Sequence, residues 1–106
     1  MTNVVDFDFS APSALAILRE CAKDDRRVQY SPHALQRMNE RKVTNMQVLR
    51  CLCRGTITEN PHRDIKGDWK CTVSNYDSGQ YINVAVVFKQ NKNNERAVII
   101  TVFLGI

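Results

Sequence analysis

No apolar run in this sequence of 106 residues approaches the roughly 18 residues that a membrane-spanning helix requires. The amino terminus, Met-Thr-Asn-Val-Val-Asp-Phe-Asp, is acidic where a secretory signal would be basic and then apolar. We therefore expect a cytoplasmic protein without a membrane partner. Repeats, low-complexity tracts and long linkers are also lacking, and the length predicts a single domain over residues 1–106.

The sequence also lacks the spacings of a metal site. Its four cysteines form no Cys-x-x-Cys motif, and its two histidines do not stand at ligand spacing. On a helix, Cys51 and Cys53 would point in directions about 200° apart, so they could not readily bind one ion. Because reducing conditions in the cytoplasm oppose disulfides, we expect small buried thiols, no metal and no cofactor.

The sequence does carry a modest excess of positive charge. Lysine and arginine number 15 against 11 acidic residues, which gives a net charge of +4 and a pI near 9.0. This balance favours anionic partners such as nucleic acid without excluding others.

Apolar residues in the first half of the chain recur every three or four positions, which is typical of helices that bury one face. We expect helices over residues 10–24, 32–42 and 44–54. The expected N-caps are Ser10 or Ser13 for the first helix, Ser31 for the second, and Thr44 in a capping box with Gln47 for the third. Gly55 is expected to end the third helix in the left-handed conformation.

Beyond Gly55 the period changes to two, which is typical of strands. We expect strands within residues 56–59, 69–74, 82–88 and 98–104, separated by polar turns at 60–64, 75–79 and 90–94. The last two strands are apolar on both faces and should lie inside the sheet. The predicted fold class is α+β, with N-terminal helices packed on one face of a small antiparallel sheet of about four strands. The other face, or a groove between helix and sheet, is left for a ligand.

One imidazole and two guanidinium side chains recur at intervals of four in the second predicted helix. His33, Arg37 and Arg41 would form one stripe along it. Guanidinium groups suit phosphate oxygens, and an imidazole can exchange protons near neutral pH. A solvated helix face with weak surface ion pairs would show the same spacing. The combination nevertheless predicts phosphate binding and phosphodiester chemistry.

Residues 30–41, Tyr-Ser-Pro-His-Ala-Leu-Gln-Arg-Met-Asn-Glu-Arg, resemble the signature of the bacterial family called domain of unknown function 4258. The resemblance covers about residues 28–104. Its other matching segments are Val48-Leu49, Gly55-Thr56-Ile57, Asp64, Gly67, Trp69 and residues 98–103. It implies a RelE-like toxin fold, similar to the RelE-type and barnase-like ribonuclease toxins. Such proteins are small, basic, cytoplasmic and metal-independent, and many are inhibited by an antitoxin. The helix over residues 10–24 lies outside the matching region.

From this resemblance we expect an endoribonuclease that cleaves RNA, free or bound to the ribosome, through attack of a ribose 2′-hydroxyl on the adjacent phosphate. His33 would be the acid or base, and Arg37 and Arg41 would hold the phosphate. The further candidates are Thr101 for catalysis and Lys70, Tyr81 and His62 for RNA binding. We expect Trp69 in the core rather than in the site.

Two other functions fit the same residues. A binding module would hold nucleic acid or an acidic protein without chemistry, for which Arg37 and Arg41 suffice. An interaction protein would act on a partner through a sheet edge or the first helix. Replacement of His33 by Ala separates the three functions, because an enzyme would lose turnover but keep RNA binding, a binder has no turnover to lose, and an interaction protein would ignore RNA.

Overall fold

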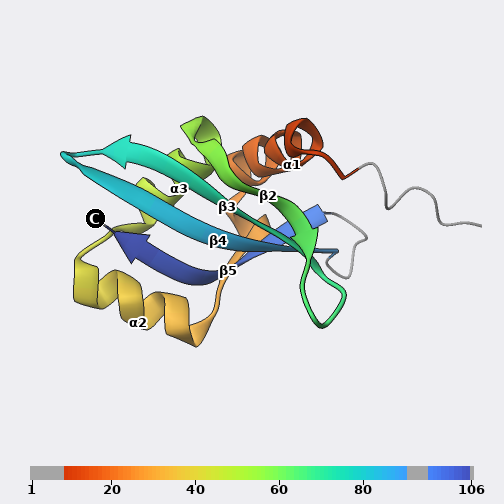
Figure 1. The fold of residues 1–106 in the computed structure, drawn as a ribbon. Helices are drawn as coiled ribbons and strands as arrows, with labels where there is room; N and C mark the ends of the chain where they lie inside the picture. Colours follow the sequence, from red (N-terminus) through yellow and green to blue (C-terminus); the bar gives the residue numbers. More distant parts are fainter. Residues whose placement is uncertain (1–8, 91–95, 106) are drawn as a thin grey trace, which may run out of the picture.

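The computed structural model describes residues 9–90 and 96–105, and it has an α+β fold in which three α-helices precede most of a five-stranded sheet (Figure 1). The elements in chain order are α1 (Ala11–Lys23), the short 3-10 helix η2 (Asp25–Arg27), β1 (Val28–Tyr30), α2 (Pro32–Arg41), α3 (Asn45–Arg54), β2 (Thr56–Arg63), β3 (Trp69–Asp77), β4 (Gln80–Gln90) and β5 (Arg96–Gly105). None of the described helices has the length and apolarity to cross a bilayer.

The five strands form one mixed sheet in the order β1-β5-β4-β3-β2. All neighbours are antiparallel except β1, which runs parallel to β5 and pairs Val28 with Val98 and Tyr30 with Ile100. The expectation of about four antiparallel strands is therefore wrong in strand number and in one direction. A strand of three residues has too short a pattern to be recognised before its partner is known. The inner positions of β4 and β5 are confirmed.

The helices cover one face of the sheet (Figure 1). In this view α1 and α3 lie behind the sheet, and α2 packs along β5 at the side where β1 lies. Their apolar residues join the inward residues of the strands in one core, which is where most hydrophobic stabilisation arises. Its fully buried members include Leu18, Leu52, Val73, Val84 and Ile100.

The helix starts are as predicted, but one helix end differs. Ser10 caps α1, Ser31 caps α2, and Thr44 and Gln47 form the capping box of α3. The left-handed C-cap belongs to Lys42, with φ 57°, whereas Gly55 is extended, with φ −71° and ψ 171°. Gly55 is required for another reason. A Cβ atom there would lie 2.5 Å from the carbonyl oxygen of Cys51 and 2.7 Å from that of Ser74.

One predicted turn lies further along the chain, a second is shorter than expected, and most of the third lies beyond the described residues. β2 continues through the predicted break to Arg63, with two register shifts along it. Pro61 is tolerated because β2 is an edge strand. The turn between β3 and β4 contains only Ser78 and Gly79, both with positive φ, as a two-residue hairpin turn requires. Residues 91–95 of the predicted last loop are not described.

Trp69 was expected in the core, but it is half-buried in a small aromatic cluster beside the core. Its ring lies 5.2 Å from that of Phe9, which in turn lies 4.9 Å from Phe88. The guanidinium of Arg63 sits 5.0 Å from the centre of the indole ring, a cation–π contact. This tryptophan therefore serves packing rather than the site described below.

Candidate functional site

The face of the sheet opposite the helices, here called the open face, carries polar side chains. Along β3, the buried residues Cys71 and Val73 point to the core. Lys70, Thr72 and Ser74 alternate with them and so point to the open face. These three polar side chains of β3 are thus gathered on one surface, as the alternation in the sequence indicates.

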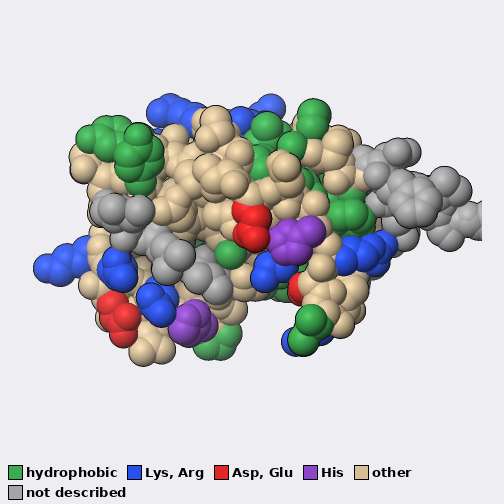
Figure 2. All heavy atoms as spheres, in the orientation of Figure 1, with side chains coloured by type: hydrophobic (Ala, Val, Ile, Leu, Met, Phe, Trp, Pro, Cys, Tyr) green, Lys and Arg blue, Asp and Glu red, His purple; other side chains and the backbone are tan. Residues whose placement is uncertain are grey.

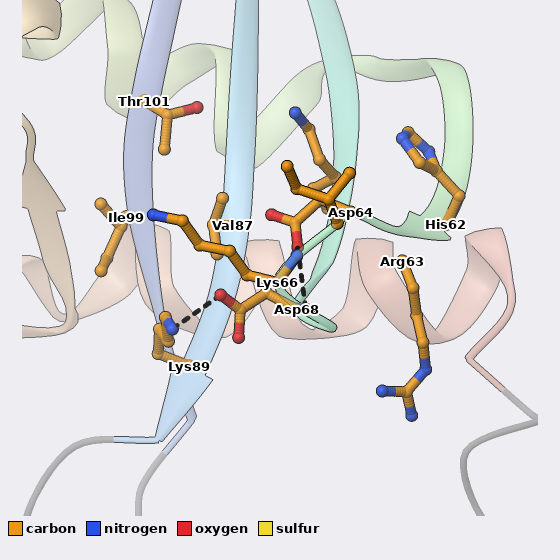
Figure 3. A pocket seen from close by; sticks show the side chains of 11 residues that line it. His62, Arg63, Asp64, Lys66, Asp68, Val87, Lys89, Ile99 and Thr101 are labelled. Atoms are coloured by element: carbon orange, nitrogen blue, oxygen red, sulfur yellow. Dashed lines mark hydrogen bonds and ion pairs between the residues drawn. The ribbon is translucent and has the colours of Figure 1, made fainter.

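A hollow of about 750 Å³ lies on this face, and we call it the basic hollow (Figure 3). It spans the sheet from His62 on β2 to Thr101 on β5. Val87 and Ile99 form its apolar floor. The remaining lining residues are Lys70, Lys89 and the segment Arg63–Asp64–Ile65–Lys66 with Asp68. A hollow with an apolar floor and convergent polar groups is the usual form of a ligand site.

The loop between β2 and β3 forms one wall of the basic hollow, and its own hydrogen bonds fix its shape. The Asp64 carboxylate accepts hydrogen bonds from the backbone N–H groups of Lys66, at 2.9 Å, and Asp68, at 3.0 Å. These bonds, chiefly the one from Asp68, lower the pKa of Asp64. Gly67 adopts φ 85° and donates to the Asp64 carbonyl at 2.9 Å. The loop is therefore preorganised without a ligand.

Positive charge predominates in the basic hollow. Its four lysine and arginine side chains face two carboxylates, those of Asp64 and Asp68. Lys89 pairs with Asp68 at 2.9 Å, while Arg63 donates to the Gly67 carbonyl at 2.8 Å. Figure 3 shows the Lys66 side chain reaching over the hollow. An anionic group such as a phosphate would meet a net positive field there.

His62 stands at the β2 side of the basic hollow and is exposed. Its Nδ1 lies 3.0 Å from the carbonyl oxygen of Asn60, and its Nε2 lies 4.0 Å from a carboxylate oxygen of Glu59. The contact with the Asn60 carbonyl orients the ring, and Glu59 places a carboxylate near its other nitrogen. Glu59 also accepts a hydrogen bond from the Thr72 hydroxyl at 2.7 Å, which fixes it on the open face.

The predicted stripe on α2 begins beside this hollow. Ser31, the N-cap of α2, donates its backbone N–H to the Ile100 carbonyl at 2.9 Å and its hydroxyl to the Thr101 carbonyl at 3.2 Å. These two bonds place the start of the helix next to Thr101, whose side chain lines the basic hollow. His33 follows two residues later and is exposed. Figure 2 shows both histidines of the chain on the same face of the molecule.

The structure thus brings some predicted residues together and separates others. Thr101, Lys70 and His62 share the basic hollow, and the α2 stripe of His33, Arg37 and Arg41 starts at its β5 side. Arg37 is half-buried, and Arg41 is exposed in the last turn of α2. Tyr81 lies elsewhere, in a second hollow near the hairpin between β3 and β4.

Sequence reasoning missed Lys66 and Lys89 as members of the site. Lys66 belongs to the segment Asp64-Ile-Lys-Gly-Asp68, in which an aspartate at the first position and a glycine at the fourth are a turn signal. Lys89 lies within β4, two residues after Val87, and therefore on the same open face of the sheet. Within the described residues, no three His, Cys, Asp or Glu side chains gather closely enough to hold a metal ion.

Comparison with known proteins gives one match. The family model described as "Domain of unknown function (DUF4258)" matches residues 30–104. The matched region begins just before α2 and ends within β5, so it contains the α2 stripe, the basic hollow and the second hollow. No curated protein and no solved structure matches the chain.

Proposed function

Since the chain belongs to the family described as domain of unknown function DUF4258, we propose that it is a metal-independent endoribonuclease related to the RelE-type and barnase-like toxins. The start of α2 lies beside the basic hollow, and both fall within the matched region. RNA is the proposed substrate, and an antitoxin that covers the open face is the proposed partner. A cytoplasmic location is part of the proposal. Reducing conditions there would preserve the free thiols, which are buried at Cys21, Cys51 and Cys71, whereas Cys53 is exposed, contrary to the expectation of buried thiols.

The observation that carries this proposal is the junction of α2 with β5. The two hydrogen bonds from Ser31 set the His33 turn of the helix beside Thr101 and the basic hollow. An imidazole, two guanidinium groups on the same helix, and a hollow with excess lysine and arginine thereby occupy adjoining surfaces. Phosphodiester cleavage without a metal needs these groups, namely a proton donor or acceptor and cations for the phosphate oxygens.

The proposed reaction is transesterification within RNA. The 2′-oxygen of a ribose attacks the adjacent phosphorus, its proton passes to a base, and the bond from phosphorus to the 5′-oxygen breaks as an acid protonates that oxygen. His33 takes one of the two proton-transfer roles, and His62 supplies a second imidazole at the basic hollow for RNA binding. Arg37 and Arg41 hold the non-bridging oxygens, with Lys70 and Thr101 as further contacts.

The experiment that tests this proposal is RNA cleavage after brief induction in bacterial cells, where ribosomes are present. Wild type is compared with His33→Ala and with a matched control, Asn39→Ala, which is exposed on another side of α2. Transesterification leaves 5′-hydroxyl ends, so these ends are captured and mapped separately from 5′-phosphate ends. Loss of an acid or base should lower cleavage by about 100-fold or more.

We expect wild type and Asn39→Ala to cut RNA at the same positions, and His33→Ala to cut none of them. Purified His33→Ala should unfold at the wild-type temperature, because the side chain is exposed. Cuts that persist in His33→Ala would remove His33 from the mechanism. An absence of cuts and of growth arrest in wild type would contradict the enzyme and favour a binding module.

A further inference from the structure

A second hollow, of about 390 Å³, lies on the open face beside the hairpin that joins β3 to β4. We call it the tyrosine hollow, because Tyr76 and Tyr81 form one of its sides. The two residues are direct cross-strand partners, and their rings stand 5.0 Å apart at an interplanar angle of 68°. Figure 2 shows a hydrophobic patch over this end of the molecule, at the upper left.

The exposure of these two rings is unusual. Tyr76 is 62% exposed and Tyr81 is 54% exposed, although aromatic side chains of this size normally bury most of their area. The rings contact each other and leave broad surface to the solvent. A pair of adjoining exposed aromatic rings is the platform on which unpaired nucleobases stack.

The rest of the tyrosine hollow is polar. The Thr58 and Ser74 hydroxyls lie 3.2 Å apart, and the Ser74 hydroxyl donates to the Asn83 side-chain oxygen. This chain of contacts crosses β2, β3 and β4 and fixes the three side chains. With its oxygen engaged, Asn83 can offer a ligand its amide nitrogen, a donor that suits the carbonyl and ring-nitrogen acceptors of a base edge. Arg54, exposed at the end of α3, adds a cation at the rim.

The tyrosine hollow and the basic hollow share the open face. Lys70 lines one and Ser74 lines the other, and both point to the same side of β3. Four residues of an extended strand separate them by about 13 Å. A single strand of RNA that places one phosphate in the basic hollow can therefore continue along β3 to the tyrosines.

We propose that the tyrosine hollow is a nucleobase subsite, in which Tyr76 and Tyr81 stack an unpaired base of single-stranded RNA and Asn83 donates a hydrogen bond to its edge. This inference rests on the proposed function in that RNA is the ligand. The subsite selects single strands over duplexes, because a base that is paired and stacked within a duplex has no free face to place on a tyrosine ring. Stacking accepts every base, so only modest sequence preference follows.

The test measures binding of a short labelled oligouridylate and, separately, of inorganic polyphosphate, which carries charge but no base. All proteins carry His33→Ala so that RNA stays intact. Tyr81→Leu removes the ring, Tyr81→Phe keeps it, and Tyr76→Leu is the second variant that removes a ring. Lys70→Gln is the control for charge.

We expect each leucine variant to bind oligouridylate about 5- to 100-fold more weakly and polyphosphate as before. Tyr81→Phe should bind both like the parent protein. Lys70→Gln should weaken both. Unchanged oligouridylate binding in the two leucine variants would overturn the subsite, as would an equal loss for oligouridylate and polyphosphate, or a parent protein that binds no oligouridylate.

The nucleobase subsite and the enzyme proposal can each be supported or rejected independently of the other. Tyrosine-dependent RNA binding without His33-dependent cuts would keep the subsite and place it in a binding module. Cuts that depend on His33 but binding that ignores both tyrosines would keep the enzyme and reject the subsite.

Discussion

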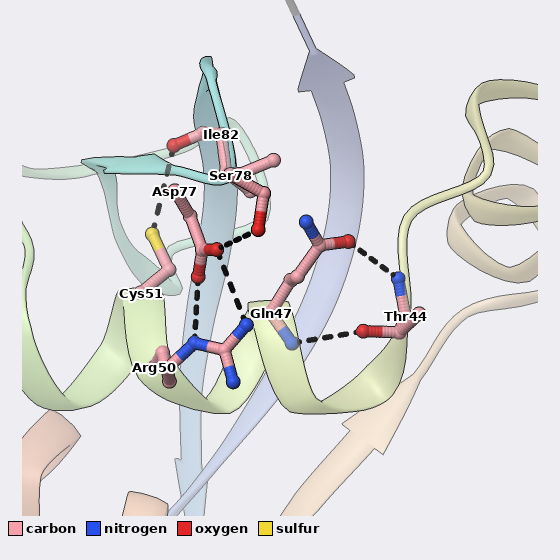
Figure 4. Close-up of polar contacts among 7 residues, drawn as sticks. All are labelled: Thr44, Gln47, Arg50, Cys51, Asp77, Ser78 and Ile82. Atoms are coloured by element: carbon pink, nitrogen blue, oxygen red, sulfur yellow. Dashed lines mark hydrogen bonds and ion pairs between the residues drawn. The ribbon is translucent and has the colours of Figure 1, made fainter.

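Arg50 and Asp77 form a bidentate ion pair, with Nε and one terminal nitrogen of the guanidinium 2.7 and 3.1 Å from the two carboxylate oxygens (Figure 4). The pair joins the middle of α3 to the tip of the hairpin between β3 and β4. Ser78 adds a hydrogen bond to the same carboxylate at 2.7 Å. Because Asp77 follows Tyr76 directly, this pair also positions the strand end that carries the tyrosine hollow.

Replacement of Asp77 by Asn should reduce stability in a pH-dependent way. The hydrogen bond from Arg50, with that from Ser78, lowers the pKa of Asp77 from 3.8 to about 2. As the pH falls, the Asp77 carboxylate is therefore protonated at a higher pH in the unfolded chain than in the folded protein. The stabilisation by the ion pair is present above about pH 4 and is lost as the pH falls toward 2. We expect Asp77→Asn to unfold several degrees below wild type at pH 7 and close to wild type near pH 2. Thermal unfolding followed by circular dichroism measures both.

The control for this experiment is Asp25→Asn, which removes an exposed carboxylate of η2 on another element. Its unfolding temperature should stay near that of wild type at both pH values. A gap between Asp77→Asn and wild type that is equally wide at pH 7 and at the acid end would show that the ionised carboxylate is not what stabilises the hairpin.

Ser31 should be a positioning residue for the α2 stripe. Its hydroxyl accepts from the Ala34 N–H at 3.0 Å and contacts the Thr101 carbonyl at 3.2 Å. Ser10 has the same capping role in α1, where it accepts from the Ser13 N–H at 3.3 Å. Replacement of either serine by Ala should lower the free energy of unfolding by about 1 kcal/mol.

Only Ser31→Ala should also lower RNA cleavage, because the start of α2 lies beside the basic hollow, whereas Ser10 caps α1 on the helix-covered side. Ser31→Thr retains the hydroxyl and should restore cleavage. Equal cleavage by Ser31→Ala and Ser10→Ala, measured in the cellular assay above at matched protein levels, would count against a positioning role.

Gly55 should tolerate a methyl group less well than Gly67 does. A Cβ at Gly55 would overlap the backbone carbonyls of Cys51 and Ser74, neither of which can turn away without moving α3 or β3. We expect Gly55→Ala to cost about 3 kcal/mol, near the upper end for overpacking. At Gly67 no atom lies within 4 Å of the added Cβ, and the positive φ of 85° alone should cost about 1 kcal/mol. Urea unfolding of both variants measures the loss in the free energy of unfolding. A larger loss for Gly67→Ala than for Gly55→Ala would contradict the packing argument.

The helices could be predicted closely because their signals are local. Ser31, Pro32 and the Thr44–Gln47 box each act within a few residues of their own helix. Gly55 shows the limit of that reasoning. Its sequence context suits a left-handed cap, yet the residue is needed because β3 passes close to the end of α3, and that approach depends on residues about 20 positions away.

The candidate site, like the helices, could be predicted from the sequence only where the signals are local. Alternation placed Lys70 on the open face, but the sharing of one hollow by Lys70, His62 and Thr101 depends on strand register, which the sequence does not state. A predicted turn over residues 75–79 concealed the pairing of Tyr76 with Tyr81. Reading Ser78-Gly79 as a two-residue turn makes these tyrosines cross-strand partners, so this relationship could have been found from sequence.

Lysines of the basic hollow should contribute to RNA binding through phosphate contacts. Each ammonium that neutralises a phosphate releases a condensed counterion, so Lys70→Gln and Lys66→Gln should each reduce the slope of log affinity against log salt by about 0.7 for a single strand. Lys23→Gln is the matched control, because Lys23 is exposed in the last turn of α1, on the helix-covered side. Binding of labelled oligouridylate to the His33→Ala protein at several salt concentrations gives the slopes. If Lys23→Gln lowers the slope as much as Lys70→Gln does, RNA is held by the overall charge of the protein and the basic hollow is not its phosphate site.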